Sequence, residues 1–210
     1  MRRKMEVLEL KMPKNMKIVA YMAKSKMIGS SKGEFKNLID FIKEKGVKFI
    51  TLDFQLDLKN FKATELAQQL NKMSIPYFQV DIPEYAMGYI YEEIVEKEDL
   101  LNELCDEYEI MEDKDSYKGE SLKNWIDMLK EEILQKEIFI SLRLRPQWIV
   151  KKMLDLARKF EDKEVSFLHY VQEDICEDIC PQVTRELRDV GVKVINYNVK
   201  KNLRDIIAKS

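Results

Sequence analysis

Acidic side chains and the single histidine of the chain lie at or near the ends of predicted strands. Asp53 and Asp81 each end an apolar run, and His169 lies inside another. Ligands of an open parallel sheet bind beyond the carboxyl ends of its strands, so these three residues are candidates for one catalytic site. Together they suit a divalent metal and metal-assisted hydrolysis or phosphoryl transfer. The alternative is that the carboxylates are ordinary strand-end residues and that His169 is a hydrogen-bonded core histidine.

A segment rich in hydrogen-bond donors follows the first predicted strand. It contributes seven candidate ligand-binding residues, namely Lys24, Ser25, Lys26, Ser30, Ser31, Lys32 and Gly33. The segment leads into a helix N-terminus, where free backbone N–H groups and the helix dipole favour an anion. Neither a Walker P-loop nor a G-x-G-x-x-G fingerprint is present. The pattern favours an anionic small molecule such as a nucleotide, and the alternative is a capped helix with surface lysines.

The cysteines supply a fourth catalytic candidate. Cys176 and Cys180 are four residues apart, which is not the spacing of a zinc knuckle, and too few further ligands lie close by in the sequence. Pro181 predicts that Cys180 is the N-cap of a helix, a position that favours a reactive thiolate, although the acidic residues around it oppose one. Inert, half-buried cysteines are the alternative. A serine hydrolase is not expected, because G-x-S-x-G is absent, and no cofactor follows from the sequence.

Composition limits the class of protein. The 210 residues are 45% hydrophobic, and 36 Lys+Arg against 38 Asp+Glu give a net charge of -2, which argues against a uniformly basic nucleic-acid binder. Three cysteines do not make a disulfide framework. No run of 18 apolar residues occurs, so no membrane span is expected. We therefore predict a cytoplasmic protein.

Charge is unevenly distributed along the chain. Residues 1–36 carry a net charge of +7, and residues 92–115 carry a net charge of -10. Arg143 and Arg145 fall on a predicted strand that adds to the basic surface, yet no nucleic-acid-binding motif accompanies them, so nucleic acid is not expected as a partner. The acidic segment suits an oppositely charged neighbour, a homodimer contact or a protein-interaction scaffold.

Strand and helix patterns alternate along most of the chain, which predicts an α/β fold. We expect one α/β domain over residues 1–210, with an open, mostly parallel sheet of five to six strands flanked by helices. A helical hairpin is inserted at residues 84–136, with its two helices separated at Lys118 and Gly119. The predicted strands cover residues 17–22, 47–54, 76–82, 138–145, 164–171 and 192–199.

The layout resembles the bacterial and archaeal family of unknown function numbered 488, which has a Cys-His-Arg motif. The matching stretches are EFKNLIDFIKEKGVKFITLD, NFKATELAQQL, IPYFQVDIPEYAMG, EVSFLHYVQED, TRELRDVG and KVINYN. The family usually has an arginine after the second-strand aspartate, where this chain has Phe54, and its motif corresponds here to Cys180-Pro181-Gln182. The resemblance implies an α/β fold, and only Asp53 and Cys180 carry over as site residues.

Overall fold

The computed structural model describes residues 8–25, 32–53 and 61–197, and the chain divides into two compact units. Residues 1–81 and 145–210 form the first, which we call the α/β unit, and residues 82–144 form the second, the helical hairpin. Each unit has its own buried clusters of apolar side chains. We describe the two units separately.

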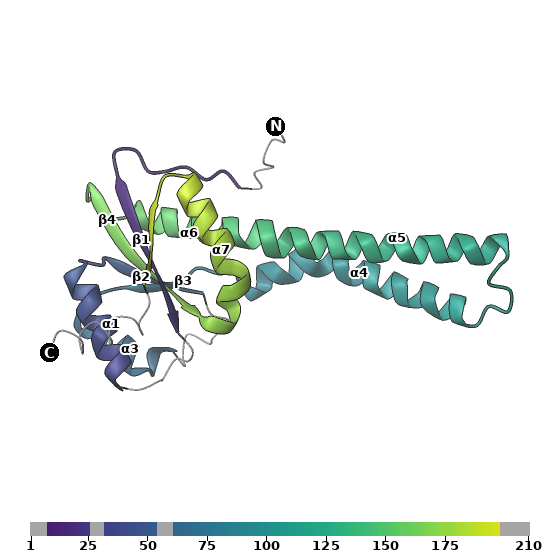
Figure 1. Ribbon diagram of the computed structural model, residues 1–210, viewed down its shortest axis with the longest axis horizontal. Helices are drawn as coiled ribbons and strands as arrows, with labels where there is room; N and C mark the ends of the chain where they lie inside the picture. Colours follow the sequence, from purple (N-terminus) through teal and green to yellow (C-terminus); the bar gives the residue numbers. More distant parts are fainter. Residues whose placement is uncertain (1–7, 26–31, 54–60, 198–210) are drawn as a thin grey trace, which may run out of the picture. The chain divides into compact units, whose positions relative to one another are not determined.

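Five parallel strands make the sheet of the α/β unit, in the order β3-β2-β4-β1-β5 (Figure 1). Parallel strands are covered on both faces, which accounts for the continuous apolar runs that predict them. The prediction of an α/β fold with an open parallel sheet is confirmed. The strands are β1 (Lys17–Ser25), β2 (Phe49–Asp53), β3 (Tyr77–Gln79), β4 (Glu164–Gln172) and β5 (Lys193–Tyr197).

Helices cover both faces of this sheet. On one face, α1 (Lys32–Glu44) and α3 (Glu65–Lys72) share a buried cluster with Ile50 and Leu168. On the other face, α6 (Arg145–Ala157) and α7 (Glu173–Asp189) share a cluster with Phe167. Neighbouring side chains along a strand point to opposite faces, so odd-numbered residues of β4 face α6 and α7.

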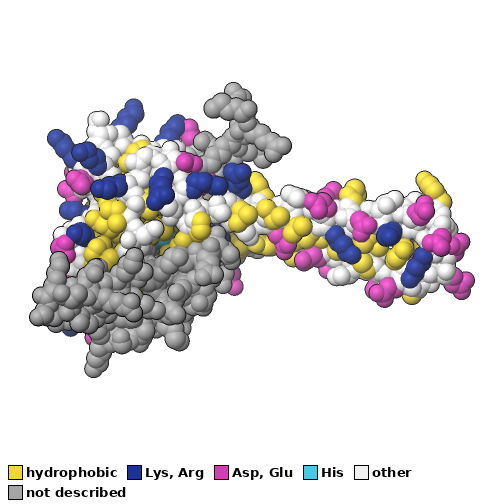
Figure 2. Space-filling model, in the orientation of Figure 1, with side chains coloured by type: hydrophobic (Ala, Val, Ile, Leu, Met, Phe, Trp, Pro, Cys, Tyr) yellow, Lys and Arg dark blue, Asp and Glu magenta, His cyan; other side chains and the backbone are white. Residues whose placement is uncertain are grey.

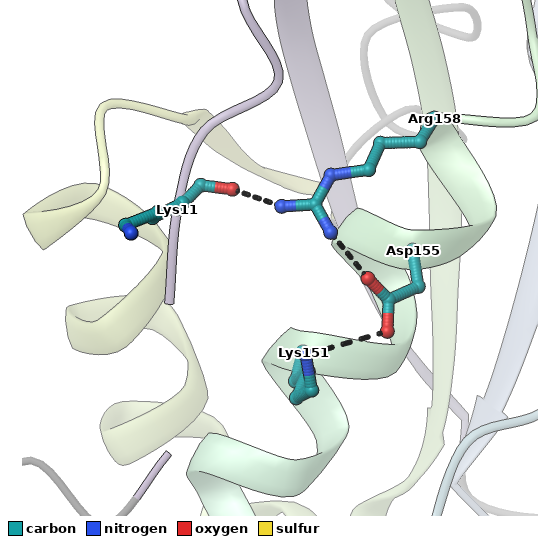
Figure 3. Close-up of polar contacts among 4 residues, drawn as sticks. All are labelled: Lys11, Lys151, Asp155 and Arg158. Carbon is teal, nitrogen blue, oxygen red and sulfur yellow. Dashed lines mark hydrogen bonds and ion pairs between the residues drawn. The ribbon is translucent and has the colours of Figure 1, made fainter. Parts of the chain in front are cut away.

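The segment before β1 is held against α6. The backbone N–H of Leu8 donates to Oε1 of Gln147 at 3.1 Å, and the Arg158 guanidinium donates to the carbonyl oxygen of Lys11 at 2.6 Å. Arg158 also pairs with Asp155 at 2.5 Å, and Lys151 lies on the other side of the same carboxylate (Figure 3). The segment from residue 8 to residue 16 therefore packs as an arm and adds no strand to the sheet.

The helical hairpin consists of α4 (Glu84–Glu109) and α5 (Tyr117–Phe139), followed by the π-helical segment η1 (Ile140–Leu144). The two long helices lie side by side (Figure 1) and bury two small clusters centred on Ile126 and Ile133. The hydroxyl of Ser116 caps α5 by accepting from the backbone N–H of Gly119 at 3.2 Å. The turn thus precedes Ser116, and the predicted break at Lys118 and Gly119 lies inside the first turn of α5.

The strand predicted over residues 138–145 is wrong, because this stretch is helical. Apolar and polar residues can also alternate over a short stretch of helix when the number of residues per turn changes. The π-helical turn changes that number here. Pro146 follows directly and has no N–H group to donate, so the regular helical hydrogen bonding is interrupted at the same place. The sheet accordingly has five strands among the described residues.

A pair of glycines in the hairpin allows a matched test of its packing. A methyl group at Gly119 would overlap the backbone of Lys114, whereas a methyl group at Gly88 would meet nothing within 4 Å. We expect Gly119→Ala to destabilise the hairpin by about 1–3 kcal/mol through overpacking. Gly88→Ala should instead raise its stability by up to about 1 kcal/mol, because alanine favours helix. Thermal unfolding followed by circular dichroism measures the stability of both variants. Equal effects at the two positions would contradict the close approach of Gly119 to the backbone of Lys114.

Candidate functional site at the carboxyl edge of the sheet

The three candidates predicted from strand ends lie on neighbouring strands. Asp53 ends β2, Asp81 follows β3 by two residues, and His169 lies on β4, with β2 between β3 and β4. The register pairs His169 with Thr51, and Asp53 with Val171, so these positions share the carboxyl part of the sheet. The side chain of Asp53 lies outside the described residues. The sheet therefore brings the backbone positions of the three candidates to one edge.

His169 is completely buried on the face of the sheet that α6 and α7 cover. Its Nδ1 atom lies 3.0 Å from Oγ1 of Thr51, and its Nε2 atom has no hydrogen-bond partner among the described residues. Burial lowers the pKa of His169 to about 3, and contact with Thr51 and the negative charge of Asp81 oppose the shift. The imidazole is therefore neutral near pH 7. Its surroundings are those of the core histidine that the sequence left as an alternative.

Asp81 is bound by Arg145 through both carboxylate oxygens. Nε of Arg145 donates to Oδ1 at 2.8 Å, and Nη2 donates to Oδ2 at 2.5 Å. The side chain of Asp81 is 9% exposed and that of Arg145 is 20% exposed, so the pair is shielded from water. Bidentate pairing of this kind fixes geometry as well as charge. The carboxylate of Asp81 is thus engaged by a cation supplied from the start of α6.

Sequence reasoning missed the role of Arg145. The residue falls in the stretch whose alternation predicts a strand, where the sequence indicates a basic surface, and it is 64 positions from Asp81. No local spacing rule connects two residues so far apart. The one available signal is that Asp81 and Arg145 are the residues at which the chain leaves and re-enters the α/β unit.

A metal centre built from these residues receives no support from the structure. Within residues 8–25, 32–53 and 61–197, no group of three or more His, Cys, Asp or Glu side chains is placed to hold a metal ion. The carboxylate of Asp81 contacts the guanidinium of Arg145, and Nδ1 of His169 contacts the hydroxyl group of Thr51. The metal-dependent hydrolase that the sequence offers as an alternative stays a prediction.

The donor-rich segment lies partly outside the described residues. Lys24 and Ser25 end β1, where the register pairs them with Val171 and Gln172 of β4, and Lys32 and Gly33 begin α1. Lys26, Ser30 and Ser31 lie outside the described residues, as do the side chains of Lys24, Ser25 and Lys32. The backbone therefore places both ends of the segment at the same edge of the sheet as His169.

The strands β1 and β4 are neighbours whose following helices pack on opposite faces. The chain leaves β1 toward α1, which packs beside Ile50, and leaves β4 into α7, which packs beside Phe167. Such a point is the topological switch point of an open parallel sheet, which is where ligands of this class of fold bind. Lys24 and Ser25 stand at this point.

Cys180 does not occupy the position that the sequence predicts. Helix α7 begins at Glu173, so Cys180 lies within it and Pro181 is an interior proline. Acidic residues at positions 173 and 174 suit a helix N-terminus, which explains the earlier start. Cys180 is buried and disulfide-bonded, whereas Cys105 in the hairpin has a free thiol. The prediction that Cys180 is an N-cap is wrong, and its sulfur is held in a disulfide and is not a free thiol.

Comparison with models of known families, with curated proteins and with solved structures finds no match to this chain. The resemblance to family 488 therefore stays a prediction that rests on the quoted stretches. Among the described residues, no helix combines the length and apolar character that crossing a membrane requires.

Proposed function

We propose that the α/β unit binds an anionic small molecule, such as a nucleotide, at the switch point between the carboxyl ends of β1 and β4. The observation that carries this proposal is the switch point, where α1 and α7 leave adjacent strands toward opposite faces. Ligands of open parallel sheets bind at this location. The start of α1 at Lys32 adds first-turn backbone N–H groups, which have no acceptor within the helix, and the positive end of a helix dipole.

The charge of the α/β unit supports an anionic ligand. Its two segments, residues 1–81 and 145–210, contain 29 Lys+Arg and 20 Asp+Glu, a net charge of +9, although the whole chain has a net charge of -2. A positive field of this kind concentrates anions near the surface of the unit. Lysines at positions 24, 26 and 32 border the proposed site in sequence and are the side chains that we assign to the ligand.

Hydrolysis at the same edge has weaker support than binding. Asp81 is engaged by Arg145, and burial keeps His169 neutral and away from solvent. A general acid or base must reach the proton that it transfers, and a fully buried imidazole does not reach a substrate at the switch point. We therefore assign these residues to the support of the sheet edge, with the ligand held by the donor-rich segment.

Replacing two lysines tests the proposal. With ATP, GTP and inorganic phosphate as probes, we expect Lys24→Ala and Lys32→Ala each to raise the dissociation constant of the bound probe about tenfold, because each removes a charged donor. Isothermal titration calorimetry at about 0.1 M salt measures this change. Lys43→Ala is the control, since Lys43 lies in the last turn of α1 and is exposed. No binding of any probe, or equal weakening by the control, would contradict an anion site here.

A further inference from the structure

In the described part of the chain, the large hydrophobic side chains that are exposed all belong to the helical hairpin. Among the described residues, ten large apolar side chains are exposed, and all ten lie between residues 82 and 144. Single exposed apolar residues are normal on any protein, whereas neighbouring ones that form a patch mark a surface that contacts something else. The ten residues are Tyr85, Tyr89, Val95, Ile110, Tyr117, Trp125, Met128, Leu134, Ile138 and Leu142.

Trp125 and Met128 stand out because of where they lie on α5. Trp125 is 46% exposed and Met128 is 51% exposed, and they are three positions apart, so they are neighbours on the helix surface. Lys118, Trp125 and Glu132 are spaced by seven, which places them in one row along the hairpin. Lys118 pairs with Glu107 at 2.8 Å, and Glu132 pairs with Lys97, so this row borders α4.

The opposing row of α4 has the same spacing. Glu93, Leu100 and Glu107 are seven residues apart, and Glu93 pairs with Lys136 of α5. Leu100 is half-buried and lies between the two ion pairs that flank Trp125. Glu96 and Glu103 occupy the next row outward on α4 and are exposed. We call this surface the Trp125 face: Trp125, Met128 and Leu100 at the centre, with Glu96, Glu103 and the ion pairs of Glu132 with Lys97 and of Glu107 with Lys118 around them.

The charge of the hairpin defines the chemistry of its partner. Residues 82–144 contain 18 Asp+Glu and 7 Lys+Arg, a net charge of -11. The hairpin therefore has too few basic residues to balance the charge of its carboxylates. Figure 2 shows acidic and hydrophobic side chains interspersed along one side of the hairpin. Such a surface is complementary to a helix that has apolar residues on one side and lysines or arginines beside them. It repels nucleic acid and anionic membranes.

A second copy of this chain fits the surface poorly. Two hairpins would bring together two surfaces of -11 each, and like charges oppose contact. The α/β unit has the opposite charge, but its described part exposes no large apolar side chain to cover Trp125 and Met128. The apolar centre and the acidic surroundings are satisfied together only by a partner that is both apolar and basic.

We infer that the Trp125 face binds a basic amphipathic helix of another protein. Aromatic and methionine side chains are enriched at the centres of protein interfaces, and a tryptophan there contributes a large share of the affinity. The side chain of Met128 is flexible and polarisable, so it adapts to a partner's apolar residues. The hairpin thereby recruits a second protein to the α/β unit and whatever ligand that unit holds, and this inference does not depend on the ligand site.

The test uses the full chain and a synthetic peptide of leucine and lysine whose order segregates the two residue types on a helix. We expect calorimetry to give a micromolar dissociation constant at about 0.1 M salt. The double variant Trp125→Ser/Met128→Ser should raise it about tenfold or more. A peptide of the same composition in scrambled order should bind at least about tenfold more weakly, because it offers charge without an apolar face.

Leu134→Ser/Ile138→Ser is the matched control. These residues are 48% and 41% exposed, yet they lie roughly 180° and 140° away from Trp125 around α5. The control should change the dissociation constant by less than about twofold, with circular dichroism unchanged in both double variants. Equal weakening by the control, or equal binding of the scrambled peptide, overturns the inference. A dimer of the chain that sedimentation detects and that Trp125→Ser/Met128→Ser abolishes also overturns it, since the occupant is then a second copy.

Discussion

Arg145→Ala is expected to lower the free energy of unfolding of the α/β unit by about 3 kcal/mol. The substitution leaves the carboxylate of Asp81 shielded from water and without the guanidinium that contacts both of its oxygens. Removing one partner of a largely buried ion pair costs more than the pair itself contributes, because the remaining charge has lost its compensation. The effect exceeds that of a surface pair, which is at most about 1 kcal/mol.

Urea unfolding measures this effect when one tryptophan reports on the α/β unit. Trp125→Phe removes the fluorophore of the hairpin and leaves Trp148 in α6. Arg158→Ala is the control, since Arg158 also pairs with an aspartate but its side chain and that of Asp155 are each 40% exposed. We expect the control to lose about 1 kcal/mol or less. A loss of that size for Arg145→Ala as well would show that the shielded pair contributes no more than an exposed one.

Removing both charges separates the two contributions of the pair. Asp81→Asn/Arg145→Met keeps similar volumes and leaves no buried charge, so most of the lost stability should return. If the double variant is as unstable as Arg145→Ala, the two residues act through their other contacts and not through their mutual charge. The pair joins the segment after β3 to the start of α6. These are the two points at which the hairpin is inserted into the α/β unit. The role of the pair is then to hold these two points together.

Much of the fold could be predicted because it depends on local patterns. The apolar runs of β1, β2, β4 and β5 are typical of parallel strands buried on both faces, and the long helices of the hairpin repeat apolar residues at helical spacing. Gly46 and Gly191 have positive φ at the ends of α1 and α7, where a glycine is favoured. In these places local preference and the final structure agree.

The failures share a different cause. Residues 138–145 alternate as a strand does, and only their position between two helices and the π-helical turn before Pro146 decide against it. The start of α7 at Glu173 was hidden because a proline at position 181 is the usual mark of a helix beginning. Arg145 and Thr51 became part of the carboxyl edge through contacts across 64 and 118 residues, which no local rule reports.

His169 is expected to make the stability of the α/β unit depend on pH between about pH 6.5 and pH 3. Burial lowers its pKa in the folded protein to about 3, from the ordinary value of 6.5. Within this range the unfolded chain binds a proton that the folded protein excludes, so the free energy of unfolding falls as the pH falls. The slope approaches about 1.4 kcal/mol per pH unit, and the stabilisation is fully present above pH 6.5.

Two non-titrating substitutions isolate this contribution. His169→Phe keeps a planar ring and leaves the Thr51 hydroxyl close to the carbonyl oxygen of Leu168, and His169→Asn keeps a polar group at the same position. Both variants differ from the parent in stability at neutral pH, because they change the packing of the core. Their slopes should nevertheless agree with each other and be smaller than that of the parent between pH 6 and pH 4, since the remaining titratable groups are common to all three proteins.

The same measurement decides whether His169 belongs to the core or to a ligand site. A core imidazole excludes the proton as long as the unit is folded, so the difference in slope between the parent and His169→Asn stays the same when ATP or phosphate is added. An imidazole that contacts a bound anion takes up a proton with it, and this difference would then decrease in the presence of the probe. Because the ring is completely buried and its Nδ1 atom contacts Thr51, we expect no change on adding the probe. A decrease in this difference would return His169 to the site that the sequence first suggested.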